Sequence, residues 1–112
     1  MSVSAVRLGC LLAGALASAT SFSAFYSLDL ATAKCTQIAQ GDFPNSLSFV
    51  PKGTVDRSSE ALVGYVGSTY VRIDPKTGAT TNIGSLSGGY RSSGDVVSVK
   101  GGGNFLTAIK PG

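Results

Sequence analysis

The stretch that decides the fold is residues 69–84, TYVRIDPKTGATTNIG. Its first part alternates as a half-buried strand does, with Tyr70 and Arg72 on one face and apolar residues on the other. Residues 74–78, Asp-Pro-Lys-Thr-Gly, then supply turn chemistry: Asp suits the first turn position, Pro presets the next backbone angle, and Gly accepts a positive φ. We therefore expect a β-hairpin here.

The rest of the chain after residue 24 has the same character. Apolar residues alternate over short stretches, and Gly, Pro, Asn and Asp separate these stretches. Short strands with turn signals between them, and no convincing helical period, predict an all-β fold. The eight expected strands cover residues 25–30, 35–39, 46–51, 61–65, 69–74, 79–83, 95–100 and 104–110.

The chain also carries an internal repeat. A shift of 45 residues places Asp29 on Asp74, Thr32 on Thr77 and Ile38 on Ile83, and further matches follow an insertion around residues 89–93. Each unit then holds four short strands in about 45 residues, a period that is typical of β-propeller blades. The predicted units are residues 25–68 and 69–112.

The second unit resembles the blade repeat of secreted bacterial β-propeller proteins. In that repeat an aromatic residue opens a strand, Asp-Pro-x-Thr-Gly makes the hairpin, and Thr-x-Ile-Gly closes the next strand. The resemblance implies two tandem four-stranded antiparallel blades. The first unit departs from the pattern, because Leu30 replaces the Pro and Ala33 replaces the Gly. A positive φ costs Ala about 1 kcal/mol, so we expect the first turn to adopt another geometry.

Two blades are fewer than the four to eight with which propellers close. Three explanations remain open at this point. The chain is a piece of a longer propeller, or copies of it pair to supply the missing neighbours, or its two sheets pack face to face as a small β-sandwich. In each case residues 100–112 expose a β edge that invites association with a protein partner or with a second copy.

The N-terminal residues 1–23 have the pattern of an export signal. No charge lies between Arg7 and Asp29, and an apolar run is followed by small hydroxylated residues. This pattern predicts a cleaved signal helix and a secreted or periplasmic protein, with the β-repeat region over residues 24–112. The alternative is an uncleaved membrane anchor over residues 8–28.

The composition argues against most enzyme chemistry. The 112 residues include no His, the commonest general base and metal ligand. After signal cleavage Cys35 is the one remaining cysteine, and no His exists to activate it. No calcium-loop or phosphate-loop pattern occurs, and nine scattered Lys and Arg residues make no basic stripe. We therefore expect no catalytic residues, cofactor, metal or nucleic-acid partner.

The acidic residues are predicted to be structural or solvated. Asp29 and Asp74 occupy equivalent turns, and Asp56 and Glu60 lie in a polar loop. A candidate interaction surface comes instead from aromatic and arginine residues at strand ends and loops. Its members are Tyr65, Tyr70, Arg72, Tyr90 and Arg91.

The function that we expect is that of an exported, non-enzymatic β-repeat module for protein interaction or surface structure. Two alternatives stay open. The chain is part of a propeller enzyme or ligand-binding protein whose site lies on other blades, or it is a small membrane-anchored protein.

Overall fold

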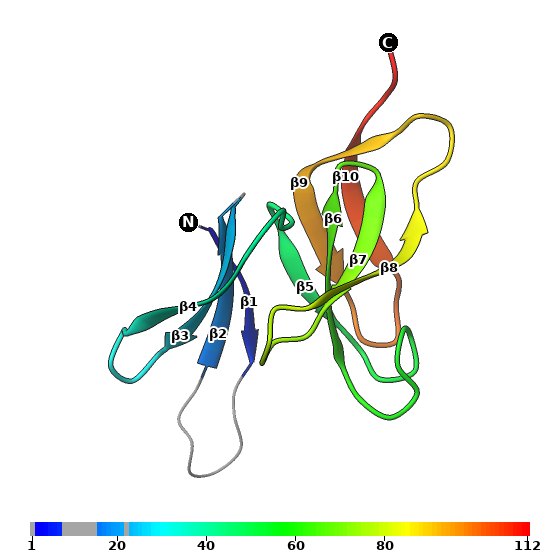
Figure 1. Ribbon diagram of the computed structural model, residues 1–112. Coiled ribbons are helices and arrows are strands. Elements are labelled where there is room, and N and C mark those ends of the chain that lie inside the picture. The colour runs from blue at the N-terminus through cyan, green and yellow to red at the C-terminus, as the bar shows by residue number, and fades with distance from the viewer. Residues whose placement is uncertain (1, 8–15, 22) are drawn as a thin grey trace.

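The computed structural model describes residues 2–7, 16–21 and 23–112, and within these it contains ten strands and no helix. Figure 1 labels the strands in chain order. They are β1 (Ser2–Arg7), β2 (Leu16–Ser21), β3 (Ala24–Asp29), β4 (Cys35–Gln40), β5 (Leu47–Val50), β6 (Ala61–Val66), β7 (Thr69–Ile73), β8 (Thr80–Ser85), β9 (Arg91–Ser98) and β10 (Asn104–Ile109). The all-β prediction is confirmed for this part of the chain, and the eight predicted strands correspond to β3–β10.

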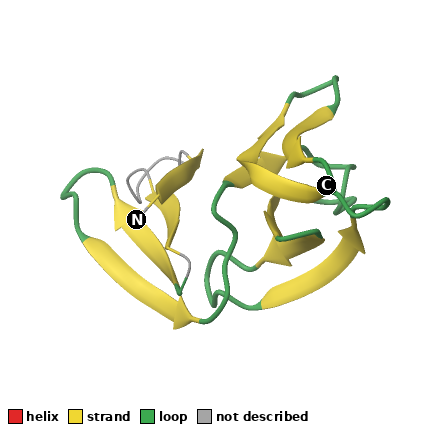
Figure 2. Ribbon diagram, turned by 90° about the horizontal axis from the view of Figure 1, so that it is seen from above, coloured by secondary structure: helices red, strands yellow, loops and turns green. Residues whose placement is uncertain are grey.

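The strands form three antiparallel sheets in which each strand pairs with the next one along the chain. The first sheet has the order β1-β2-β3-β4, the second β5-β6-β7-β8, and the third consists of β9 and β10. Strand β1 contacts β5, and β5 in turn contacts β9, so the first strands of successive sheets are neighbours. Figure 2 shows from above the first sheet on one side of the molecule and the other two sheets on the other side.

The sheets do not begin where the sequence units begin. The predicted unit at residue 25 starts on β3, the third strand of the first sheet, and the unit at residue 69 starts on β7, the third strand of the second. Each unit therefore supplies the last two strands of one sheet and the first two strands of the next.

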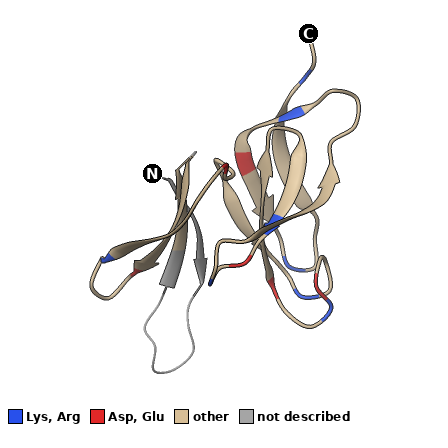
Figure 3. Ribbon diagram, viewed as in Figure 1, with Lys and Arg blue, Asp and Glu red and all other residues tan. Residues whose placement is uncertain are grey.

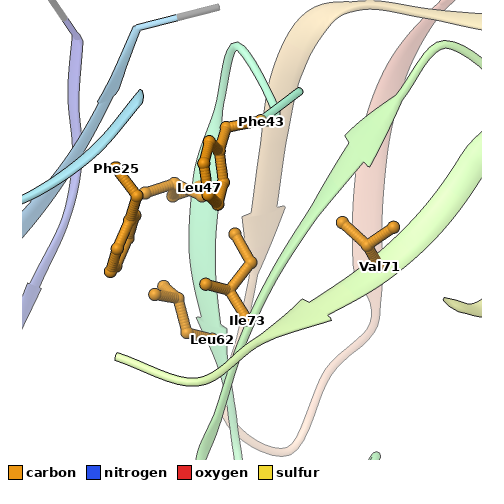
Figure 4. Close-up of a cluster of buried hydrophobic side chains, with 6 residues drawn as sticks. All are labelled: Phe25, Phe43, Leu47, Leu62, Val71 and Ile73. Carbon is orange, nitrogen blue, oxygen red and sulfur yellow. The ribbon is translucent and has the colours of Figure 1, made fainter. Parts of the chain in front are cut away.

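Two core clusters cover the two faces of the second sheet. One lies between the first and second sheets and contains Phe25, Phe43, Leu47, Leu62, Val71 and Ile73. Figure 4 shows Phe25 reaching from the first sheet toward Leu47 and Leu62 of the second. The other cluster contains Val50, Ala61 and Val63, with Val55 and Tyr70 packed against it. Because side chains alternate along a strand, the second cluster lies on the opposite face of the sheet.

The structure leaves the predicted signal helix untested. Residues 2–7 and 16–21 are strands, and most of the apolar run lies outside the described residues. Strand β2 pairs along all of β3, and its Ser18, Ala19 and Thr20 are buried. Thr20 is β-branched, and such side chains fit a pleated surface. In the described residues no helix is both long enough and apolar enough to cross a membrane.

Strand β9 begins at Arg91, earlier than the predicted start at residue 95. Its pairing with β10 shifts between Leu106, which faces Val96, and Ala108, which faces Ser92. The irregularity sets residues 93–95 against Thr107, as in a β-bulge, directly after the predicted insertion around residues 89–93 begins. The backbone N–H of Asp95, inside this irregularity, donates a hydrogen bond of 3.2 Å to Thr107 Oγ1.

The β3–β4 and β7–β8 turns use the same hydrogen bonds at positions 45 residues apart. The Asp29 N–H donates to the Lys34 carbonyl at 2.9 Å, and the Asp74 N–H donates to the Ala79 carbonyl at 2.8 Å. The Oδ1 atoms of the two aspartates each accept a backbone N–H two residues further on, at 2.9 and 2.8 Å. The predicted structural role of both aspartates is confirmed.

The prediction that the first turn adopts another geometry is wrong. Ala33 has a φ of 58°, close to the 74° of Gly78 at the corresponding position. The Asp29 side chain and the Thr32 hydroxyl, which accepts the Lys34 N–H at 3.3 Å, hold this turn closed. These hydrogen bonds offset the strain of placing an Ala in the left-handed region.

Candidate interaction surface

Two tyrosines form the centre of the candidate surface. Tyr65 on β6 and Tyr70 on β7 are cross-strand partners, and their rings stack with centroids 4.7 Å apart and planes inclined by 20°. A small cavity of about 70 Å³ separates them from Val96, Phe105 and Leu106 of the third sheet. The pair therefore lies where the second sheet faces the third.

Burial changes the acidity of both phenols. Loss of solvent raises the pKa of Tyr65, and it raises the pKa of Tyr70 with a further contribution from the neighbouring Tyr65. Both rings consequently stay neutral at physiological pH. They offer apolar ring surface and a hydroxyl group to a partner, the combination that enriches Tyr at protein interfaces.

Arg72 lies two residues beyond Tyr70 and on the same face of β7, where it is tied to a loop. Its Nη2 donates to Asp56 Oδ2 at 2.8 Å, and the exposed fractions of the two side chains are 39% and 22%. The other carboxylate oxygen of Asp56 accepts hydrogen bonds from the Ser58 N–H and hydroxyl, both at 2.8 Å, and from the Ser59 N–H at 3.2 Å.

These contacts correct the prediction that Asp56 is simply solvated. The two hydrogen bonds from Ser58, followed by that from Arg72, hold the pKa of the Asp56 carboxyl well below its usual range. The carboxylate thus anchors the loop between β5 and β6 to β7. The Asp-x-Ser-Ser spacing at residues 56–59 is an Asx-turn signal from which the local part of this arrangement could have been predicted.

A groove of about 660 Å³ runs beside this ion pair at the end of the second sheet. Its charged lining is mixed, with Glu60 and Asp74 opposing Arg72 and Lys76, and its apolar lining includes Phe49. Mixed charge of this kind favours no ligand of a single sign. In the described part of the chain no three His, Cys, Asp or Glu side chains come together as a metal ion would require.

The other two predicted surface residues lie elsewhere. Tyr90 is in the connection from the second sheet to the third, with 41% of its surface exposed, and Arg91 begins β9 opposite Ile109. The next residue, Ser92, donates its N–H to the Gly67 carbonyl in the β6–β7 turn at 2.9 Å. The structure therefore gathers Tyr65, Tyr70 and Arg72 on one face, and places Tyr90 and Arg91 at the entry to the third sheet.

The third sheet carries a further surface that residue types alone did not reveal. Val97 on β9 and Phe105 on β10 are cross-strand partners, and they are 55% and 60% exposed. Within the described residues strand β10 pairs with β9 alone. The alternation of residues 104–110 was the available signal for this strand.

Charge does not define an additional site. Figure 3 shows Lys and Arg interspersed with Asp and Glu, mainly in turns and at strand ends of the described chain. Comparison with known proteins adds no assignment, since no family model, no curated protein and no solved structure matches the chain.

Proposed function

We propose that this chain is a non-enzymatic β-repeat module of the propeller type, belonging to an exported protein, and that it binds another polypeptide through its third sheet. The observation that carries the proposal is that the third sheet has two strands where the first and second have four. Its strand β10 pairs on one side only, and its apolar cross-strand pair, Val97 and Phe105, faces solvent.

The edge that a partner would use is that of β10. Strand β9 is held against the second sheet, because the Ser92 N–H donates to Gly67 and the Val96 N–H donates to Ser46 Oγ at 3.2 Å. The outer side of β10 presents the unpaired N–H and C=O groups of a sheet border. Such a border accepts an added strand, with main-chain hydrogen bonds supplying affinity and side-chain contacts supplying specificity.

Other features support the propeller type and the exported origin. Sheets of four sequential antiparallel strands, neighbouring first strands and matching turns 45 residues apart agree with a blade repeat. The charge-free N-terminal segment supports export. The absence of His from the sequence, together with the mixed charge of the groove, favours binding over catalysis.

Sedimentation velocity over a wide range of protein concentration tests the proposal. Without its partner, the wild-type chain is expected to associate through the exposed sheet, and Val97→Ser combined with Phe105→Ser is expected to suppress this association. Leu30→Ser is the matched control, since Leu30 is also 42% exposed but lies in the β3–β4 turn. Amide hydrogen exchange within β10 should slow as the wild-type chain associates.

A wild-type chain that stays monomeric at all concentrations, with exchange in β10 independent of concentration, would contradict the proposal. Equal association of the Leu30 control and the double variant would also contradict it, because the third sheet would then not be the contact.

A further inference from the structure

We infer that the partner presents a β-hairpin of the same kind as residues 69–85 of this chain, and that this hairpin adds to β10 while covering the exposed end of the second sheet. The inference rests on the proposed function and specifies the partner's chemistry. It follows from the contacts between the first and second sheets, because part of these contacts is missing between the second and third sheets.

The interface between the first and second sheets is closed by the turn between β7 and β8. Gly78 in this turn is buried, and a Cβ added there would lie 2.5 Å from the Ala39 Cβ, 3.4 Å from Phe25 Cδ1 and 3.7 Å from Ile38 Cγ2. Phe25 is fully buried, and Leu62 and Ile73 of the second sheet belong to the same cluster. The turn between β7 and β8 thus packs on β3 and β4 at these three residues.

The second and third sheets face each other with residues that correspond to those between the first and second sheets. Tyr70 stands 45 residues after Phe25, and Leu106 stands 44 residues after Leu62. As Leu62 packs with Phe25, so Leu106 lines one cavity with Tyr70. We call the Phe25–Leu62 side of the first interface its inner half. The pair Tyr70 and Leu106 repeats this inner half between the second and third sheets.

The outer half of the first interface is the contact of the β7–β8 turn with Ile38 and Ala39. This contact has no counterpart in the described chain. Ile83 corresponds to Ile38 but is 37% exposed, and Gly84 corresponds to Ala39 but has no other atom within 4 Å of the place where a Cβ would lie. Both residues lie on β8, at the positions that a further β7–β8-type hairpin would cover. The third sheet ends at β10 and does not supply one.

The contacts define what the hairpin must contain. Its first strand must pair antiparallel with β10, which has six residues, and must present an apolar residue at the place that Ile73 occupies over Phe25. Its turn must carry Gly at the position of Gly78, because the φ of 74° there lies in the left-handed region that favours glycine. A second copy of the chain does not meet these requirements, since its own Gly78 and Ile73 are buried in its core.

A synthetic peptide of residues 69–85, added to the full-length chain, tests this inference. Because an isolated hairpin is only marginally stable, a second form of the test places a copy of residues 67–85 directly after Lys110, where the short linker raises its effective concentration. The matched control in both forms carries Gly78→Val within the added hairpin only. Amide exchange and the stability of the full chain are measured in each case.

The native hairpin is expected to slow exchange in residues 104–109 by about tenfold or more, and the Gly78→Val hairpin is expected to lose most of this protection. Ile83→Ser in the receiving chain should weaken the same protection, whereas Leu30→Ser should leave it unchanged.

Equal protection by the native and Gly78→Val hairpins would overturn the inference but leave the proposed function standing, because any strand would then suffice. No protection by either hairpin, together with concentration-dependent association of the wild type, would also overturn the inference alone. If the chain neither associates nor binds the hairpin, both proposals fail.

Discussion

Replacing Gly78 by Ala tests how the β7–β8 turn packs on the first sheet. Two costs add at this position. The φ of 74° strains any residue with a Cβ by about 1–2 kcal/mol, partly offset by a gain of about 0.4–1 kcal/mol from the stiffer unfolded chain. The new methyl would also stand 2.5 Å from the Ala39 Cβ, well inside the contact distance of about 3.5–4.0 Å.

Relieving that contact requires the turn to move away from β4, with an overpacking cost of about 1–3 kcal/mol. The total expected loss in the free energy of unfolding for Gly78→Ala is therefore about 2–4 kcal/mol. Gly67→Ala isolates the strain alone, because Gly67 has a similar φ of 63° in the same sheet and no atom within 4 Å of the added Cβ. That control should cost no more than about 1.5 kcal/mol.

Urea denaturation followed by circular dichroism gives both values. A double-mutant cycle with Ala39→Gly then separates the contact from the strain, because removing the Ala39 methyl makes room for the new one. The cycle should show a favourable coupling of about 1–3 kcal/mol between the two substitutions. If Gly78→Ala costs no more than Gly67→Ala, or if the coupling is close to zero, the close packing of this turn on β4 is refuted.

Three further predictions concern the β3–β4 turn, the ion pair of Asp56, and a hydrogen bond between β2 and the connection that precedes β5. Ala33→Asn should raise the free energy of unfolding by about 0.5–1 kcal/mol, because Asn tolerates the left-handed region better; a loss measured by denaturation would contradict this. The lowered pKa of Asp56 means that its carboxylate stabilises the fold above its unfolded pKa of about 3.9 and that this contribution is lost as the pH falls further. The stabilities of wild type and Asp56→Asn should therefore converge in acid, and a constant difference from neutral to acid pH would count against the hydrogen bonds that Ser58 and Arg72 donate to this carboxylate. Thr20→Val in the full chain removes a buried hydrogen bond of 2.7 Å to the Pro44 carbonyl and should cost about 1–3 kcal/mol in denaturation, whereas a neutral effect would rule the bond out as a contribution to stability.

Features that depend on nearby residues could be predicted from the sequence. The alternation of short apolar stretches and the Asp-Pro-x-Thr-Gly turn indicated β3–β10, because a hairpin is formed by residues that are close together in the chain. The same alternation placed Tyr70 and Arg72 on one face. The geometry of the turn at Ala33 was predicted wrongly. The prediction used only the cost of a positive φ for Ala and left out the hydrogen bonds of Asp29 and Thr32, which hold the backbone in place.

Features that depend on distant residues could not be predicted in this way. The strands at residues 2–7 and 16–21 have a composition that also suits a signal helix, and their sheet forms through pairing with β3. The ion pair of Asp56 and Arg72 joins residues 16 positions apart. The exposure of Ile83 depends on which segments pack against β8, which is a property of the whole arrangement.

The sequential strand order of the second sheet has a mechanical consequence. The chain enters this sheet at Leu47 and leaves it at Ser85, and the pairings of these residues with Gly64 and Thr69 place both at the same end of the sheet, on opposite borders. The hydrogen bonds of antiparallel strands run perpendicular to the strands. Tension between Leu47 and Ser85 would therefore pull along these bonds and break them one after another from that end, so the sheet would peel open at low force instead of resisting as a sheared unit.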